Sequence, residues 1–505
     1  MMKVYTPEAV RKAERYLIDE LGTSALGLMK KAAAEMYRLS AGMINDAGSV
    51  CVLCGKGNNA GDGYELARLI HTSGRRVSCV RVFSQAPCTD IALLCHNDYI
   101  NSGGTVTDDA GEALKLISGA DLIIDAVFGI GFGGCIEKES ALYRMLEVAN
   151  NSSAKKVALD VPSGVNSFDG SIGNIAFMSE LTLTVSVVKT GMLSYPAKKY
   201  CGMIEALDIG IPESIINKFE KDEFIIPDDA YIGEALPKRD PESNKGDFGK
   251  LLCICGSENM TGAAVMSVGA ALRSGAGLVT LASEKSVTDV VKVKYAEPIY
   301  RSLDFSDIQT QKALECDLNT YSAVLIGCGL GKSEKKKHFV ENVIKTYTGV
   351  LVIDADGINM ISDNINILKE AAGTVIITPH PGEFARISGE NTEYINNNRI
   401  KCAREFSASY RCITVLKGAG TVVADAYGKT AVNTTGNPGL AKGGSGDVLA
   451  GLIAGLAANK RILPFDAALS GAYLHGKAAD VLKERYSEYG LLPGELAEEF
   501  AKMLP

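Results

Sequence analysis

The stretch SVCVLCGKGNNAGDG, residues 49–63, decides the fold class of this chain. An apolar run of strand length leads into nine residues, 55–63, that contain four glycines, two asparagines and an aspartate. Glycines after a buried strand let the backbone approach a phosphate, and the free N–H groups of a following helix attract anions. We interpret the stretch as a strand, a ligand-binding loop and a helix; a tight turn without a ligand is the alternative.

The same loop lacks the features of a dehydrogenase site. Its glycine spacing is not GxGxxG, and no acidic residue ends the next apolar run at 82–85, where it would hold a ribose. An ordinary NAD site for hydride transfer is therefore disfavoured.

Strand-length apolar runs alternate with helical patterns outward from this loop. Residues 1–48 read as helices at 8–19 and 25–43, and further strands are predicted at 76–83, 121–129, 155–163 and 181–188. A break rich in proline and charged residues follows at 212–247, and the alternation restarts at Lys250. The pattern predicts two α/β domains with parallel sheets, 1–221 and 222–505.

Composition limits the class of protein. The chain of 505 residues carries a formal net charge of -8, and no basic stripe is available for nucleic acid. Its 13 cysteines are scattered through apolar runs, which favours buried thiols in a reducing cytosol. Cys51 and Cys54 form a CxxC, but they fall inside a predicted strand. Because no signal core or stretch of about 18 apolar residues occurs, we expect a cytoplasmic protein that does not enter a membrane.

Acidic residues end two of the predicted strands in the first domain. Asp125 precedes a glycine-rich run at 129–134, and Asp160 precedes the turn Pro162-Ser163-Gly164. A strand-end carboxylate that has lost hydration needs a cation, backbone N–H groups or a ligand hydroxyl as partner. One such aspartate fits a helix cap. Two on the sheet edge that carries the asparagine-rich loop indicate a ligand site.

The strongest local signal lies in the second domain, in the stretch NPGLAKGGSGDVLAG at 437–451. The glycine loop at 443–446 opens an apolar helix, whose N–H groups and dipole can hold an anion. Asp447 falls in the first turn, where a carboxylate can deprotonate an attacking hydroxyl while the loop takes the developing charge. A helix-terminal charge is the alternative for Asp447. The spacing is not that of a Walker A loop.

Other predicted strand ends are expected to lie at the same site as the glycine loop at 443–446. Lys417 and two glycines follow one apolar run and suit a nucleotide phosphate, and His380 stands between two prolines. Asp354 and Asp356 follow another run, where a role near magnesium and a role as helix caps both remain open.

Residues 1–215 resemble the epimerase domain of the NAD(P)H-hydrate repair enzymes, through NNAGDG, DAVFGIGFGG and LDVPSG. The resemblance implies a Rossmann-like sheet and exchange of configuration at C6 of the hydrated nicotinamide ring of NADHX or NADPHX. It also implies a potassium ion held by Asn59, Asp125 and Ser163, all oxygen ligands that suit a hard cation.

The substrate contacts implied by this resemblance are Asn58, Asn59, Ala60, Gly61, Asp62, Gly129, Ile130, Gly131, Phe132, Gly133, Gly134, Cys135 and Asp160. Asp160, the remaining strand-end carboxylate, is our candidate acid/base for the C6 hydroxyl proton. We interpret Lys189 as a surface lysine, with balance of the carboxylates as the alternative.

Residues 225–503 resemble the dehydratase domain of the same enzymes, through GSGD, KGAGT, TPHPGE and DADGIN, extended by KGDFG at 245–249 and MTGAAV at 260–265. The resemblance implies a ribokinase-like fold. It also implies phosphorylation of the C6 hydroxyl of the S-epimer by ADP or ATP with Mg²⁺, followed by loss of phosphate.

The contacts implied for the hydrated dinucleotide are Ala263, Gly329, His380 and Asp447, and those for the nucleotide are Lys417, Gly418, Ala419, Gly420, Thr421 and Gly446. Asp447 is the implied base. Two residues depart from the family pattern: Ser445 replaces threonine and keeps the hydroxyl, and Cys328 replaces proline, which is expected to loosen its turn.

The two domains predict one chemical task. A dehydratase that is specific for one epimer would leave the other epimer unrepaired, and an epimerase in the same chain makes that epimer available. We therefore expect a bifunctional repair enzyme. We also expect a homo-oligomer. A ribokinase-type small-molecule kinase with an N-terminal nucleotide-binding module is the rival hypothesis. A non-catalytic N-terminal binding domain is another, and RNA binding is disfavoured by the charge.

Overall fold

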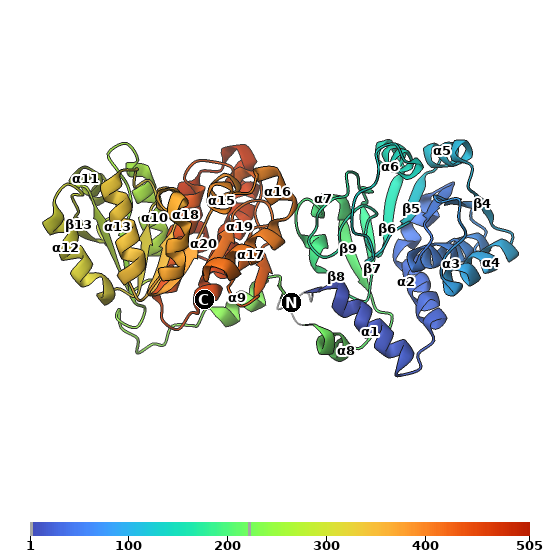
Figure 1. Ribbon diagram of the computed structural model, residues 1–505, viewed down its shortest axis with the longest axis horizontal. Helices are drawn as coiled ribbons and strands as arrows, with labels where there is room; N and C mark the ends of the chain where they lie inside the picture. The colour runs from blue at the N-terminus through green and yellow to red at the C-terminus, as the bar shows by residue number, and fades with distance from the viewer. Residues whose placement is uncertain (1–3, 221–223) are drawn as a thin grey trace. The chain divides into compact units, whose positions relative to one another are not determined.

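The computed structural model describes residues 4–220 and 224–505. The chain divides into two compact units between Phe224 and Ile225 (Figure 1). Both units are α/β, and both contain a mainly parallel sheet, as the alternation of strands and helices predicted.

Within residues 4–220, seven strands form a sheet in which every pairing is parallel. In spatial order these are β4 (Thr105–Thr107), β3 (Val77–Arg81), β2 (Val50–Cys54), β5 (Leu122–Ala126), β6 (Lys155–Leu159), β7 (Leu181–Val185) and β9 (Met203–Leu207). The carboxyl ends of β2, β5 and β6 are adjacent at one edge, because these strands are neighbours. A separate pair joins β1 (Val4–Tyr5) to β8 (Val188–Lys189).

Helices cover both faces of this sheet (Figure 1). Side chains alternate along a strand, so Val50, Val52 and Cys54 pack with α2, α3 and α4, while Cys51 and Leu53 pack with α5 and α6. The helices are α1 (Pro7–Asp19), α2 (Ala25–Asp46), α3 (Asn58–Thr72), α4 (Asp90–Asn101), α5 (Ala110–Ser118), α6 (Ala141–Asn151), α7 (Lys198–Cys201) and α8 (Glu213–Phe219), with a 3₁₀ turn η1 (Thr190–Leu193).

Helix α1 is fastened beside the sheet by its first residues. The Thr6 side chain caps the helix by accepting from the Ala9 N–H, and the Thr6 N–H donates to Glu220 Oε2 at 2.6 Å. Apolar residues of α1 pack against α8 through Ile215 and Ile216. These contacts fix the position of α1, which forms one wall of the cavity described below.

Within residues 224–505, ten strands form the second sheet. Their spatial order is β10 (Phe224–Ile225), β19 (Thr430–Val432), β18 (Val422–Ala424), β17 (Ile413–Leu416), β16 (Thr374–Ile377), β15 (Val350–Ile353), β14 (Ala323–Ile326), β11 (Lys250–Ile254), β12 (Leu278–Ser283) and β13 (Ile299–Ser302). Pairings from β13 to β17 are parallel, and β17–β18 and β18–β19 are antiparallel.

The second core lies between this sheet and helices α10, α18, α19 and α20. Helices α10 and α18 approach closely because position 451 is glycine: a Cβ there would lie 2.1 Å from the Ser267 carbonyl oxygen. The helices of this unit are α9 (Asp229–Ala235), α10 (Thr261–Arg273), α11 (Lys285–Lys294), α12 (Ile308–Asp317), α13 (Glu334–Thr346), α14 (Asp356–Met360), α15 (Pro381–Ser388), α16 (Thr392–Asn397), α17 (Arg399–Tyr410), α18 (Ser445–Ala458), α19 (Pro464–Gly490) and α20 (Leu496–Phe500). The 3₁₀ turns are η2 (Leu318–Thr320), η3 (Ser362–Glu370), η4 (Pro438–Leu440) and η5 (Pro493–Glu495).

Some elements were not predicted. Strands β4 and β9 and helices α5, α8 and α9 lie in segments that were left without structure or read as a break. The predicted strand at 181–188 is interrupted at Ser186, where φ is 63°, and continues as β7 and β8. No helix in the described residues is long and apolar enough to cross a bilayer.

Candidate active sites

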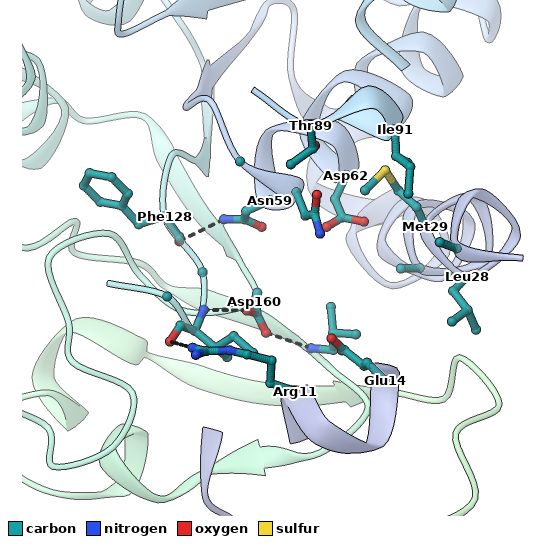
Figure 2. Close-up of a pocket in the computed structure, with 18 of the residues that line it drawn as sticks. Arg11, Glu14, Leu28, Met29, Asn59, Asp62, Thr89, Ile91, Phe128 and Asp160 are labelled. Carbon is teal, nitrogen blue, oxygen red and sulfur yellow. Dashed lines mark hydrogen bonds between the residues drawn. The ribbon is translucent and has the colours of Figure 1, made fainter. Parts of the chain in front are cut away.

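A cavity of about 700 Å³ opens at the carboxyl edge of the first sheet (Figure 2). Its walls come from α1, α2, the start of α3, the loop after β5, and the ends of β6, β7 and β8. The sequence-predicted residues that line it are Asn58, Asn59, Asp62, Gly129, Ile130, Gly131, Phe132 and Asp160.

The remaining predicted contacts are not in the cavity lining. Ala60 and Gly61 lie inside the first turn of α3, and a Cβ at Gly61 would lie 2.6 Å from Met29 Sδ. Gly133, Gly134 and Cys135 follow the lining part of the loop, and Cys135 is exposed.

Asp160 is held by hydrogen bonds from three directions. Its Oδ1 accepts from Lys189 Nζ at 2.6 Å and from the Val185 N–H at 3.3 Å, and its Oδ2 accepts from the Ile130 N–H at 3.0 Å. The backbone of Asp160 has a φ of 62°, so the left-handed conformation turns the chain just after β6. Figure 2 shows this carboxylate in the cavity wall.

Lys189 is buried, with 1% of its surface exposed, so its interpretation as a surface lysine is wrong. Besides Asp160, its ammonium donates to Thr184 Oγ1 and to the Val185 carbonyl oxygen, each at 2.8 Å. Burial of an ammonium is tolerated only when a counter-charge and acceptors replace water. Asp160, about thirty residues earlier in the chain, supplies that charge.

Hydrogen bonds to Phe128 link Asn59, which lines the cavity, to the buried pair of Asp125 and Ser163. Asn59 Nδ2 donates to the carbonyl oxygens of Phe128 and Leu159, at 2.9 and 3.1 Å. Asp125 accepts from the Ser163 N–H and from its hydroxyl, each at 2.7 Å, and from the Val127 N–H at 3.1 Å. Complete burial raises the pKa of Asp125 to about 6.

One oxygen atom of this group lacks a hydrogen-bonding partner among the residues that the structure describes. Asn59 Oδ1 is buried, and no partner for it occurs in the described parts of the chain. A buried amide oxygen without a hydrogen-bond donor is costly. The other two residues of the group offer a carboxylate and a hydroxyl, which are hydrogen-bonded to each other. Oxygen donors with one negative charge match the chemistry of K⁺.

Glu14, which no sequence motif marked, enters the cavity from α1. Burial, followed by the nearby Asp160 carboxylate, raises the pKa of Glu14 to about 7, and Lys189 and Arg11 oppose that rise. Burial, Asp160 and Glu14 also raise the pKa of Asp62. No local motif surrounds Glu14, so only the packing of α1 reveals its position.

The second site forms at the start of α18. The helix begins at Ser445, and its cap Gly444 has a φ of 102°, a conformation suited to glycine. A Cβ at Gly444 would lie 2.3 Å from Met266 Sδ, and one at Gly446 would lie 3.2 Å from Lys417 Nζ. The ammonium of Lys417 therefore lies beside the first turn of the helix, where an anion would bind.

Two acidic residues surround the Lys417 ammonium: Asp354, which follows β15, and Glu383, in the first turn of α15. Lys417 Nζ donates to Asp354 Oδ1 at 2.7 Å and lies 3.9 Å from Glu383 Oε2. Asp354 is 1% exposed and also accepts from Thr378 Oγ1 at 2.6 Å. Asp356 accepts from the Gly331 N–H at 2.8 Å.

Asp447, in the first turn of α18, lies near Asp354 and Lys417. Burial and the Asp354 carboxylate raise the pKa of Asp447 to about 6, and Lys417 limits the rise. Single ligand atoms of Cys328, Asp354 and Asp447 lie within 4.8 Å of one another. A carboxyl with a pKa near the working pH can act as a general base.

His380 caps α15 and keeps one edge exposed. Its Nδ1 accepts from the N–H groups of Gly382 and Glu383, at 3.0 and 3.4 Å, and its side chain is 52% exposed. A neutral ring with Nδ1 as acceptor presents Nε2–H as a donor.

The turn that carries Gly329 is closed, although Cys328 was expected to loosen it. The Leu330 N–H donates to the Gly327 carbonyl oxygen at 3.1 Å, and the Gly256 N–H donates to the Cys328 carbonyl oxygen at 2.8 Å. Gly329 faces Ala263, because a Cβ on Gly329 would lie 2.6 Å from the Ala263 Cβ.

The segment 417–421 connects β17 to β18, and Gly418 and Ala419 are exposed. Arg399, which the sequence did not mark, supports this segment by donating to the carbonyl oxygens of Leu416 and Lys417, at 2.7 and 3.0 Å.

Comparison with known proteins gives matches over both units. A family described as NAD(P)H-hydrate dehydratase matches residues 251–502, and one described as YjeF-related protein N-terminus matches residues 25–191. The chain is 32% identical over 501 residues to the bifunctional NAD(P)H-hydrate repair enzyme of Escherichia coli, covering 98% of this chain and 92% of that protein.

Two solved structures each match just over half of this chain. A hypothetical protein from Streptococcus mutans is 28% identical, with a TM-score of 0.50 over 56% of this chain and 100% of that chain. The ADP/ATP-dependent NAD(P)H-hydrate dehydratase from Bacillus subtilis, co-crystallised with ATP and Mg²⁺, is 32% identical, with a TM-score of 0.49 over 56% of this chain and 98% of that chain.

Proposed function

The chain belongs to the family of bifunctional NAD(P)H-hydrate repair enzymes, and we propose that it returns hydrated NADH and NADPH to use by two reactions. The first unit, which ends at Phe224, exchanges the R- and S-epimers of NAD(P)HX at C6. The second unit, which begins at Ile225, dehydrates the S-epimer at the expense of ADP or ATP.

In the first unit, the cavity accepts the hydrated nicotinamide ring beside Asp160. The ion pair with Lys189 and the Ile130 N–H hold the Asp160 carboxylate in position, where it can accept the proton of the C6 hydroxyl. The free N–H groups at the start of α3 and the loop at 129–132 supply donors for the polar parts of the substrate.

We assign K⁺ to Asn59, Asp125 and Ser163, on the evidence of the unpartnered Asn59 oxygen and the buried Asp125 carboxylate. When bound, the ion would supply the positive charge that this buried carboxylate lacks. These three residues support the loop at 128–130 through the Asn59 and Ser163 hydrogen bonds to Phe128.

In the second unit, Asp447 carries the proposal. This carboxylate stands in the first turn of α18, next to the glycine loop and near Lys417. It can take the proton of the C6 hydroxyl as that oxygen attacks the terminal phosphorus of the nucleotide, while the helix N–H groups and Lys417 offset the charge of the phosphoryl group. Departure of phosphate from C6, with loss of a C5 proton, restores the double bond of the reduced ring.

The nucleotide enters as its Mg²⁺ complex, and we place it along Lys417–Thr421 and Gly446. The hydrated dinucleotide lies toward Ala263, Gly329 and His380, where the exposed Nε2–H of His380 can donate to it. A reducing, cytoplasmic setting is supported by the ten cysteines that are buried as free thiols. A homo-oligomer stays a prediction.

Product analysis tests this function against a ribokinase-type kinase. The purified chain is given the S-epimer of NADHX with ADP, or separately with ATP, and phosphate and reduced ring are measured. We expect one inorganic phosphate for each NADH recovered. Accumulation of a stable phosphorylated alcohol, without recovery of NADH, would show that the second unit is a kinase.

A further inference from the structure

The first cavity contains an acid that no motif marked. Glu14 enters from α1, while Asp160 at the end of β6 is already paired with Lys189. In the described residues Glu14 has no hydrogen-bonding partner, and it lies close enough to Asp160 and Lys189 to feel both charges. Figure 2 shows Glu14 and Asp160 in the wall of the same cavity.

The charges around the cavity distinguish the carboxyl that can accept a proton from the one that can give a proton. Three carboxyls, Glu14, Asp62 and Asp160, line the cavity together with one buried ammonium, Lys189. The other cations in the lining, Arg11, Arg15 and Lys56, are more exposed to solvent, which screens their charges. The Lys189 ammonium and two backbone N–H groups donate to the Asp160 carboxylate. A second carboxyl near that anion is more stable with its proton. Asp160, held by three donors, is thus placed to accept a proton, and Glu14, whose pKa is raised, is placed to give one.

The chemistry of the substrate requires such a pair. In the hydrated ring the C6 hydroxyl stands on a carbon bonded to the ring nitrogen N1, so the group is a hemiaminal. A hemiaminal loses its configuration when the C6–N1 bond opens to an aldehyde and closes again on the other face. Opening needs a base at the hydroxyl and an acid at nitrogen.

We propose that Glu14 is the acid of the epimerisation and Asp160 its base, acting through an open-chain aldehyde. Asp160 takes the proton of the C6 hydroxyl, the C6–O bond becomes a carbonyl, and the C6–N1 bond breaks. Its electron pair stays on N1, which receives the proton of Glu14. After rotation of the aldehyde, N1 attacks the opposite face, Glu14 regains its proton, and Asp160 returns the other proton to oxygen. The inference rests on the proposed epimerase function.

Glu14 is better placed for this role than Asp62. Asp62 is 8% exposed in the first turn of α3, whereas Glu14 is only partly buried and can exchange its proton with solvent. The groups that face Glu14 are Asp160, Lys189, Asp62 and, on its own helix, Arg11. Burial and the Asp160 carboxylate raise the pKa of Glu14 to about 7 against the opposing effects of Lys189 and Arg11, and this value suits proton transfer near neutrality.

Glu14→Gln in the full chain tests the assignment. We expect the rate of epimer exchange to fall roughly 10²- to 10⁴-fold, with nearly unchanged binding of NADHX and unchanged dehydration of the S-epimer. Glu14→Asp keeps an acid and should recover at least part of the rate. Glu8→Gln, the same substitution at an exposed position on α1, should behave like the wild type.

The pH profile separates catalysis from a structural role. The wild-type exchange rate should fall as the pH rises through about 7, because Glu14 must be protonated at the start. This limb should be missing in Glu14→Gln. A Glu14→Gln chain with the wild-type rate and profile would overturn the inference. A wild-type chain that exchanges no epimers would instead contradict the proposed function.

Isotope labelling tests the open-chain route. With ¹⁸O in the C6 hydroxyl, we expect the inverted epimer to keep the label in most turnovers, since the C6–O bond is never broken. Loss of the label to solvent with each inversion would overturn ring opening, because it would mean that the hydroxyl leaves and water returns.

Discussion

The charged form of Asp447 destabilises the folded protein, and the same carboxylate is the proposed base of the dehydratase site. The residue is charged at neutral pH, yet burial and Asp354 raise its pKa to about 6, above the ordinary value of an aspartate. A carboxyl whose pKa rises on folding stabilises the folded state while it is protonated, and this contribution is lost as the pH rises through the folded pKa. Lys417 offsets part of the cost and lies where a phosphoryl group would bind.

Replacement of this carboxyl should therefore raise the free energy of unfolding and lower the dehydration rate. At pH 8, Asp447→Asn should raise the free energy of unfolding by up to about 3 kcal/mol, and the gain should shrink below pH 6. Its dehydration rate should fall roughly 10²- to 10⁴-fold. Denaturant unfolding at the two pH values and a dehydration assay measure this, with the exposed Glu484→Gln as control. Equal stability at pH 8 and full activity would contradict the role of Asp447.

The cation group makes a second prediction for single residues. K⁺ should slow hydrogen exchange in residues 125–132, compared with choline at equal ionic strength, because the ion binds only the folded state. Asp125→Asn removes the charge and should abolish the difference. Peptide-level exchange measured by mass spectrometry gives the result. Equal protection of the wild-type segment in both salts would argue against a K⁺ site.

The sequence predicted side chains that occur in local motifs and missed those that depend on packing. Asp160 and Asp447 were found because each ends a strand or opens a helix beside glycines. Lys189 was misread, because its counter-charge is distant in sequence. Glu14 and Arg399 lie on ordinary helical patterns, and only the docking of α1 and α17 gives them a role.

At the scale of elements, the start of α18 depends on glycine at defined positions. The Gly444 backbone is left-handed, and Gly446 leaves room for the Lys417 ammonium. Such a terminus presents N–H groups to an anion without a side chain in the way.

Gly446→Ala should therefore weaken nucleotide binding. The added Cβ would lie 3.2 Å from Lys417 Nζ, where the ammonium and the phosphate must meet. We expect the KM for ADP or ATP to rise roughly tenfold, equivalent to about 1.4 kcal/mol, with little effect on epimer exchange. In Gly443→Ala the added Cβ meets nothing within 4 Å, so this matched variant should keep the wild-type KM. Identical KM values for the two variants would count against the assignment.

Buried parallel strands were predictable and edge elements were not. Strands β2, β5 and β11 are nearly continuous apolar runs, because both of their faces are covered. Strands β4 and β9 are partly exposed at the two edges of the first sheet, and they lack that signal. The short helices α8 and α9 lie in a charged segment whose composition resembles a linker.

At the scale of the whole molecule, the two units divide the repair between them. Each unit holds its own carboxylate at its own sheet edge, and neither site borrows a residue from the other unit in the proposed mechanism. A dehydratase that accepts one epimer leaves the other behind, so complete repair requires exchange in the first unit. Exchanged epimers can pass through solution, and the scheme needs no channel.

Recovery of the reduced-ring absorbance from a mixture of NADHX epimers, with ADP or ATP in excess, tests this division most directly. The wild-type chain should restore the whole mixture, whereas Asp160→Asn should stop promptly after the S fraction and continue only at the uncatalysed rate of exchange. Wild-type recovery limited to the S fraction, or full and rapid recovery by Asp160→Asn, would contradict the account.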